Sequence, residues 1–240
     1  MSTAYGRSPG GYVWAFAEPD AGIAVMSIMF TLIARNPRLG DNFPLYFATG
    51  FMALAIYTQT ASKVGSAIKY SKSLLAYPNV TYFDAIIARL ILTVMTQALV
   101  TMLLLTGIIL GFGLNLNLNL MHAAHAVVMA AVLGFGVGTV NCFLMSMYPI
   151  WTFVWNVVNR PMFIISGVLF LIDDLPREIR DILLWNPVAH IVMRMRTAFY
   201  DTYEGVFIDT TYVYMVALIL GALGMLLLHR YHAVILDEGA

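Results

Sequence analysis

The chain has little charge and a single cysteine. Asp, Glu, Lys and Arg make up 11% of its 240 residues, whereas soluble domains average about 25%. The 13 basic residues balance the 13 acidic ones. The net charge therefore does not favour binding of a polyanion, and we expect no nucleic-acid partner. Cys142 lies in an apolar run, which excludes a disulfide framework and a cysteine-based metal site.

Motifs of common hydrolytic enzymes are also missing. The sequence has no Gly-x-x-x-x-Gly-Lys-Ser/Thr phosphate loop, no His-Glu-x-x-His and no Gly-x-Ser-x-Gly. We therefore expect no catalytic residue, and the chain cannot hydrolyse ATP by itself. The pairs His122/His125 and His229/His232 have no third ligand, so we interpret them as interfacial histidines and expect no metal site.

Apolar residues are in excess, at 60% of the chain with a mean hydropathy of +0.80. A helix needs about 20 residues to cross a hydrocarbon core about 30 Å thick. The apolar runs therefore predict an all-α integral membrane protein, a single transmembrane domain over residues 1–240 with six transmembrane helices. We expect these spans at residues 20–34, 43–62, 85–112, 122–148, 153–172 and 211–229.

The start of the chain carries aromatic residues of the kind that prefer the membrane interface. Tyr12, Trp14 and Phe16 precede Pro19, a residue that often ends a helix. We expect residues 11–18 to form an interfacial helix on the membrane surface. The alternative is a frayed N-terminus with anchoring aromatics. Residues 1–11 lack the basic start and apolar core of a cleaved signal, so we expect the first span to remain in the mature protein.

Residues 63–80 predict a short amphipathic helix outside the membrane. Leu74, Leu75 and Tyr77 offer an apolar side, lysines keep the other side polar, and Pro78-Asn79 ends the helix. Such a helix suits binding by another protein, and we expect it to couple the chain to a partner. The residues concerned are Lys63, Lys69, Lys72, Leu74, Leu75 and Pro78.

Residues 173–200 are too charged to span a membrane and too apolar for a free loop. We expect a pair of external re-entrant or interfacial helices, broken at Asn186-Pro187, because irregular backbone at membrane depth must be shielded. The alternative is a surface lid without a role in a pathway. The candidate residues are Asp173, Asp174, Arg177, Arg180, Asn186, Pro187, His190, Arg194 and Arg196. Arg194 and Arg196 point about 200° apart on a regular helix, so at most one contacts a given cargo.

The spans carry aromatic rings and no relay of Asp or Glu, which argues against a proton-coupled carrier. Rings can stack on the apolar faces of sugars, and as a set they would form a pathway wall along which a sugar chain slides. The alternative for each residue is packing or contact with lipid. The candidates are Tyr12, Trp14, Phe16, Tyr57, Phe143, Tyr148, Trp151 and Trp155.

Small residues and lysines add predictions about packing and orientation. Gly107-x-x-x-Gly111, Gly134-x-Gly136-x-Gly138 and Ala217-x-x-x-Gly221 provide faces for close helix packing. We expect this packing within the chain, and the alternative is a dimer motif. Placing both termini in the cytoplasm puts all the lysines there too, as the positive-inside rule favours. It also places the acidic segment 173–209 outside.

Several motifs together resemble the membrane subunit of type-2 ABC exporters, in the branch that moves capsular polysaccharide, with O-antigen and teichoic acid exporters as wider relatives. One departure is Asp20, where an apolar residue is more usual. The motifs are an initial Tyr-Gly-Arg, Tyr12-x-Trp14, Glu18-Pro19, Leu75-x-x-Pro78-Asn79-Val80 with Asp84 and Ala88-Arg89, Ile165-Ser-Gly167, and Leu184-Trp-Asn-Pro187 with His190.

The resemblance implies a homodimer in the bacterial inner membrane, with a pathway at the two-fold interface. It implies two cytoplasmic ABC ATPase subunits that bind ATP and Mg, and no cofactor in this chain. The cargo would be a lipid-linked polysaccharide passed on to periplasmic and outer-membrane export proteins, with residues 63–80 as the coupling helix. The alternatives are export of another glycolipid or of amphiphilic drugs, and a membrane scaffold or lipid-modifying enzyme that needs no ATPase.

Overall fold

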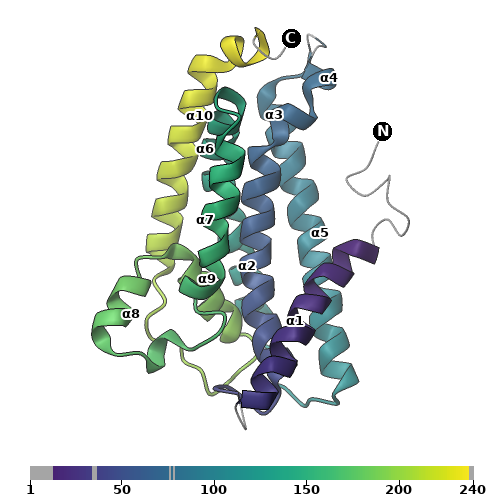
Figure 1. The fold of residues 1–240 in the computed structure, drawn as a ribbon, viewed down its shortest axis with the longest axis vertical. Helices are drawn as coiled ribbons and strands as arrows, with labels where there is room; N and C mark the ends of the chain where they lie inside the picture. The colour runs from purple at the N-terminus through teal and green to yellow at the C-terminus, as the bar shows by residue number, and fades with distance from the viewer. Residues whose placement is uncertain (1–12, 34–36, 76, 78, 238–240) are drawn as a thin grey trace.

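The computed structural model describes residues 13–33, 37–75, 77 and 79–237, and within them it contains helices and turns but no strand. Six longer helices run along the molecule (Figure 1). They are α1 (Val13–Ile33), α2 (Phe43–Gly65), α5 (Tyr82–Gly111), α6 (Leu120–Met147), α7 (Trp151–Ile165) and α10 (Thr210–Asp237). Shorter elements connect them at the two ends: α3 (Ala67–Tyr70), α4 (Lys72–Leu75), η1 (Ile172–Asp174), α8 (Arg177–Leu183) and α9 (Pro187–Arg196).

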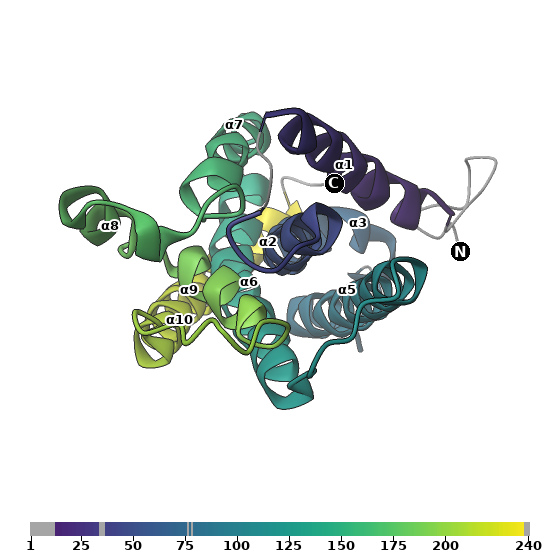
Figure 2. The same ribbon diagram turned by 90° about the horizontal axis from the view of Figure 1, so that it is seen from below.

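Helix α2 is the central element of the bundle. It begins where the Asn42 side chain accepts a hydrogen bond from the Leu45 amide at 3.0 Å, and Pro44 occupies its first turn. Helices α1, α5, α6 and α9 pack around it, and α10 packs on the other side of α6 (Figure 2). As a result, most side chains of α2 are buried, whereas α5 and α10 leave long apolar faces exposed.

Glycines on α6 allow two close helix contacts. A Cβ atom on Gly134 or Gly138 would lie 2.7 Å from the side chain of Thr60 or Val64 on α2. Gly136 faces the other way and would meet the Ala217 carbonyl oxygen on α10. The predicted close-packing role of these glycines is therefore confirmed. Gly107 and Gly111 on α5 differ, because apart from the nearby backbone of α5 itself no atom of the described residues lies within 4 Å of the position of an added Cβ.

Three helices, α5, α6 and α10, are long and apolar enough to cross a membrane. They match the predicted third, fourth and sixth spans. The fifth predicted span needs correction, because α7 ends at Ile165 and not at residue 172. Pro161 lies inside α7, and the chain turns instead at Gly167, whose φ of 75° favours glycine. The boundary at Pro19 was also wrong, since α1 continues from Val13 through it to Ile33; a proline removes one helical hydrogen bond without necessarily ending the helix.

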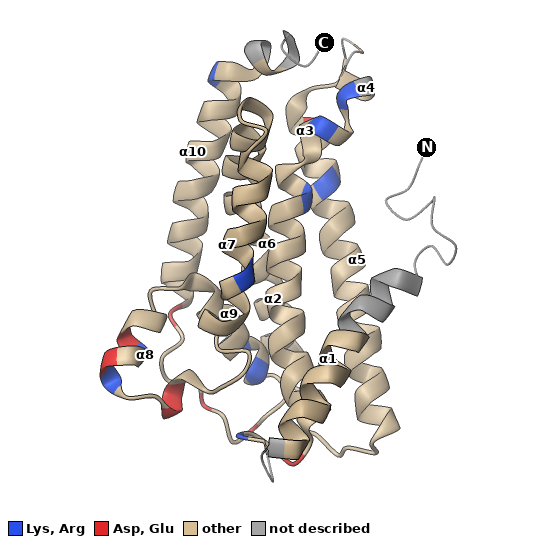
Figure 3. Cartoon of the chain, viewed as in Figure 1, with Lys and Arg blue, Asp and Glu red and all other residues tan. Residues whose placement is uncertain are grey.

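The two ends of the bundle carry different charges (Figure 3). We call the end formed by α3, α4 and the last turns of α10 the lysine end, because Lys69, Lys72 and Arg230 lie there. We call the end formed by η1, α8 and α9 the acidic end, because Asp173, Asp174, Glu178 and Asp181 lie in or beside these elements. The long helices keep the two ends apart, so each can be considered as a separate candidate site.

Candidate functional site

At the lysine end the chain leaves α2 and forms two short helices. Turns at Ser66 and Ser71 separate α2, α3 and α4. The prediction of a single amphipathic helix over residues 63–80 is therefore wrong. Serine favours such breaks because its hydroxyl competes for backbone groups, and the Ser66 hydroxyl donates to the Ser62 carbonyl at 2.9 Å. Lys63 belongs to the last turn of α2.

A separate buried cluster attaches these short helices to the bundle. Val64, Ala67 and Ile68 pack with the following residues of α5, α6 and α10: Ile86, Cys142, Leu228 and Ile235. The return to α5 is also fixed, because Thr81 and Asp84 form a capping box with hydrogen bonds of 2.9 and 3.3 Å. The helices α3 and α4 are therefore a firmly anchored feature of the surface.

The surface formed by α3, α4 and Tyr77 after them exposes apolar and aromatic side chains. Tyr70, Leu74 and Tyr77 are 67%, 52% and 65% exposed. Lys69 and Lys72 are exposed beside them, while Leu75 packs partly against the buried cluster. The Arg89 guanidinium lies 4.9 Å from the centre of the Tyr70 ring. Pro78 lies outside the described residues. We call Tyr70, Leu74 and Tyr77 the apolar ridge, which matches what a protein partner binds.

The aromatic residues predicted to form a pathway wall do not share one surface of the described chain. Tyr57 and Trp155 are buried, and the Trp155 indole donates to the Ser62 hydroxyl at 3.0 Å. The Trp151 indole donates to the Asn141 side chain at 2.9 Å. These two bonds tie α7 to α2 and α6. Polar residues inside apolar helices, here Ser62 and Asn141, are the sequence signal that would have pointed to such ties.

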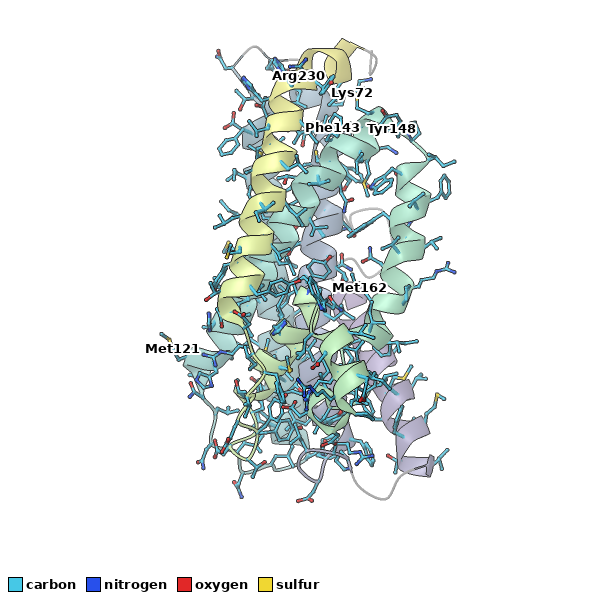
Figure 4. All side chains as sticks on the ribbon, turned by 90° about the vertical axis from the view of Figure 1, so that its left-hand side faces the viewer. Lys72, Met121, Phe143, Tyr148, Met162 and Arg230 are labelled. Atoms are coloured by element: carbon cyan, nitrogen blue, oxygen red, sulfur yellow. The ribbon has the colours of Figure 1, made fainter. Side chains whose placement is uncertain are left out.

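The other members of that aromatic set lie nearer the surface. Tyr148 is exposed and Phe143 is half-buried, both near the lysine end together with Lys72 and Arg230 (Figure 4). The Phe143 ring centre lies 5.5 Å from that of Tyr231 on α10. Trp14 and Phe16 belong to α1, but their side chains lie outside the described residues, as does all of Tyr12.

At the acidic end two helices, α8 and α9, form as predicted, and they meet at Asn186-Pro187. The Asn186 side chain accepts a hydrogen bond from the Val188 amide at 3.1 Å, and Pro187 opens α9. Helix α9 is mostly buried against α2, α6 and α10. Helix α8 has no buried residue and projects from the bundle (Figure 2).

Arg196 at the end of α9 is buried, with only 1% of its surface exposed. Its guanidinium donates to the Phe170 carbonyl at 3.0 Å and to the Val168 carbonyl at 2.8 Å. It also lies 4.4 Å from the centre of the Tyr46 ring on α2. Arg196 therefore fixes the turn after α7 to α9 and α2, and it has no free surface for a cargo.

The remaining charged residues of this end form smaller contacts. Arg194 is half-buried, and its Nε donates to His125 Nδ1 at 3.1 Å. Asp174 lies 3.8 Å from Arg38. Asp173 accepts a hydrogen bond of 2.5 Å from the Tyr203 hydroxyl. Burial, together with this carboxylate, raises the pKa of Tyr203, so the hydroxyl stays protonated and donates.

His190 connects three segments of the acidic end. Its Nε2 lies 2.9 Å from the Leu184 carbonyl, and its Nδ1 lies 3.0 Å from the Asp209 amide nitrogen. Because the carbonyl only accepts and the amide only donates, the ring is assigned as neutral with its proton on Nε2. Within the described chain, no three His, Cys, Asp or Glu residues gather as metal ligands.

Comparisons with known proteins place this arrangement in a family. The family model of the ABC-2 type transporter matches residues 2–200. The chain belongs to this family of transporter membrane proteins.

The names of three relatives are more specific than the description of the family. The polysialic acid transport protein KpsM of Escherichia coli is 24% identical over 227 residues, which are 95% of this chain and 88% of that protein. The capsule polysaccharide export inner-membrane protein CtrC of Neisseria meningitidis serogroup A is 22% identical over 95% of this chain and 86% of its own length. The corresponding protein BexB of Haemophilus influenzae is 25% identical over 85% of this chain and 78% of its own length.

Proposed function

We propose that the chain is the membrane subunit of an ATP-driven exporter that moves lipid-linked capsular polysaccharide across the bacterial inner membrane. The observation that carries this proposal is the similarity, over 85–95% of the chain, to three proteins named for capsule or polysialic acid export. Two copies of the chain and two ABC ATPase subunits would form the complex. ATP and Mg would bind in the ATPase subunits, because this chain has no phosphate loop.

The apolar ridge on α3 and α4 is the proposed ATPase-binding surface. Tyr70, Leu74 and Tyr77 offer the aromatic and aliphatic anchors that protein interfaces use, and Lys69 and Lys72 rim them. The buried cluster around Ile68 prevents α3 from moving independently of the bundle. A displacement of the ridge by the ATPase would therefore act on α2 directly.

Helix α2 gives that displacement a route to the acidic end. Its 23 residues extend over about 34 Å, and at its far end it packs against α9. Arg196 on α9 lies over Tyr46 near the start of α2 and holds the carbonyls of the turn after α7. Movement of α2 would thus shift α9 and α7 together, which is the coupling we propose.

The proposed membrane topology has six spans, with both termini and the lysine end in the cytoplasm. The lysines at one end support this orientation. Helices α8 and α9 would then be external re-entrant elements. The first turns of α1 would lie at the cytoplasmic interface of the membrane. The exposed side of α7, which includes Phe153, Val157 and Arg160, would face the second copy and the pathway.

Deletion of the gene in an encapsulated source strain tests the proposal. Capsule should disappear from the cell surface while lipid-linked glycan accumulates inside, and the purified chain should bring an ATP-hydrolysing subunit with it. Stimulation of that ATPase by small amphiphiles and not by glycolipid would favour a drug exporter. Normal capsule in the deletion strain would overturn the proposal.

A further inference from the structure

The acidic end contains a cavity that the proposed mechanism does not use. It has a volume of about 360 Å³ and lies between α8, α9 and the start of α10. This volume falls at the lower end of the range of ligand pockets in proteins, and the cavity is a depression that is largely open to the surface. The residues that matter for its chemistry are Asp181, Trp185, His190, Phe207, Asp209 and Tyr212.

Aromatic rings from three segments form the walls of this cavity. Trp185 comes from the turn between α8 and α9 and is 77% exposed. Phe207 comes from the loop before α10, and Tyr212 comes from the first turns of α10. Three flat apolar faces around one opening are more than membrane anchoring by a single tryptophan requires.

Hydrogen bonds and ring contacts hold these walls in place. The Tyr212 hydroxyl donates to the Trp185 carbonyl at 2.7 Å. The rings of His190 and Tyr212 meet edge to face with centres 5.6 Å apart, and the Arg180 guanidinium lies 4.3 Å from the centre of the Phe207 ring. The cavity is thus preorganised before anything binds, which reduces the entropic cost of binding.

Two carboxylates add hydrogen-bond acceptors at the same opening. Asp209 accepts from the Tyr212 amide through Oδ1 at 2.9 Å, and within the described chain its Oδ2 has no protein partner. Asp181 lies 3.6 Å from Arg177 and 3.8 Å from Arg180, which balance its charge. Acceptors of this kind bind hydroxyl donors, and the charge of Asp209, which pairs with no cation within the described chain, repels a phosphate.

We propose that this cavity binds one or two sugar rings of the exported glycan as the chain emerges. A sugar ring presents an apolar C–H face, which suits Trp185, Phe207 and Tyr212, and hydroxyl donors, which suit Asp181 and Asp209. A lipid tail would offer no hydrogen-bond donor to Asp209 Oδ2, and a phosphate headgroup would meet the negative charge of Asp209. The inference rests on the proposed function, and it adds an external binding site for the cargo.

The fluorescence of Trp185 provides a direct test. The intact complex with its ATPase subunits, in lipid nanodiscs, is titrated with oligosaccharides from the source strain's own capsule and with inorganic phosphate. We expect saturable quenching by the capsular oligosaccharide and none by phosphate. The saturable part should be missing in Trp185→Phe, because Trp151 and Trp155 do not line the cavity.

Two acid substitutions form a matched pair. Asp209→Asn keeps an oxygen that caps α10 but weakens the acceptor, so the apparent affinity should fall about tenfold. Glu204→Gln, an exposed acid of the same loop that does not line the cavity, should leave it unchanged.

Three results would contradict the proposal that this cavity binds sugar rings. These are saturable quenching that persists in Trp185→Phe, equal quenching by phosphate, or no quenching by the capsular oligosaccharide while capsule export is normal. Normal capsule after gene deletion would instead reject the proposed function itself, so the two failures are distinguishable.

Discussion

The two ends of the bundle show how one chain can combine a surface for a partner with a firmly packed region. At the lysine end the short helices α3 and α4 are anchored from below, and Tyr70, Leu74 and Tyr77 are left exposed. At the acidic end α9 is buried on three helices, and even an arginine, Arg196, is almost fully enclosed. A substitution should therefore affect binding at the first end and folding at the second.

Leu74→Asp should give the largest effect, because it places a charge at the centre of the apolar ridge. We expect loss of the ATPase subunit from the purified complex and loss of capsule, with normal insertion and thermal stability, since Leu74 is 52% exposed. Val206→Asp, at a 72% exposed position near the acidic end, is the matched control and should retain the ATPase. A fully assembled, active Leu74→Asp complex would show that the ATPase binds elsewhere.

Arg196→Met should act on stability. It leaves the Val168 and Phe170 carbonyls without their donor and removes the contact with Tyr46, at a cost of about 3 kcal/mol. Thermal unfolding in detergent should show a clearly lower midpoint. Arg177→Gln, at an 82% exposed side chain, should change the stability by less than about 0.5 kcal/mol. Equal midpoints for the two variants would mean that Arg196 does not stabilise this end.

Trp155→Phe should lower the stability less than Arg196→Met and more than Arg177→Gln. It keeps most of the buried ring and removes one hydrogen bond to Ser62, which is worth about 1 kcal/mol. Ser62→Ala should cost a similar amount, and the double variant should be little worse than either single one. Fully additive losses, measured by the same unfolding assay, would show that the two side chains act independently.

Arg194→Gln should have the smallest effect of the series. The side chain is half-buried and its hydrogen bond to His125 is single, so we expect a loss below about 1 kcal/mol. Capsule export should fall only if Arg194 contacts an acidic glycan, and in that case Arg194→Lys should restore part of it. A loss of export as severe as that of Leu74→Asp would place Arg194 in the pathway itself.

The sequence predicted the long apolar helices well, because uninterrupted apolar runs define α5, α6 and α10 regardless of their partners. It predicted two helices within residues 173–200, but it could not predict that Arg196 at the end of α9 is buried. The partners of Arg196 are carbonyls 26 and 28 residues earlier in the chain, and no local pattern reveals such contacts. The division of residues 63–80 into two helices was missed for a related reason, since the turns depend on Ser66 and Ser71 and on packing around Ile68.

The cavity at the acidic end was also beyond the sequence. Trp185, Phe207 and Tyr212 come from three segments, and only the fold brings them to one opening. His190 was a candidate from the sequence, but its connecting role depends on Leu184 and Asp209, which lie on either side of it in the chain.

Transport in inside-out membrane vesicles tests the central claim most directly. Vesicles that contain the chain and its ATPase subunits are supplied with radiolabelled lipid-linked capsular glycan, ATP and Mg, and the glycan protected inside is measured. We predict uptake that requires ATP, that is lost with Leu74→Asp and that is retained with Val206→Asp. Glycan that becomes protected at the same rate in vesicles lacking the chain would contradict the account.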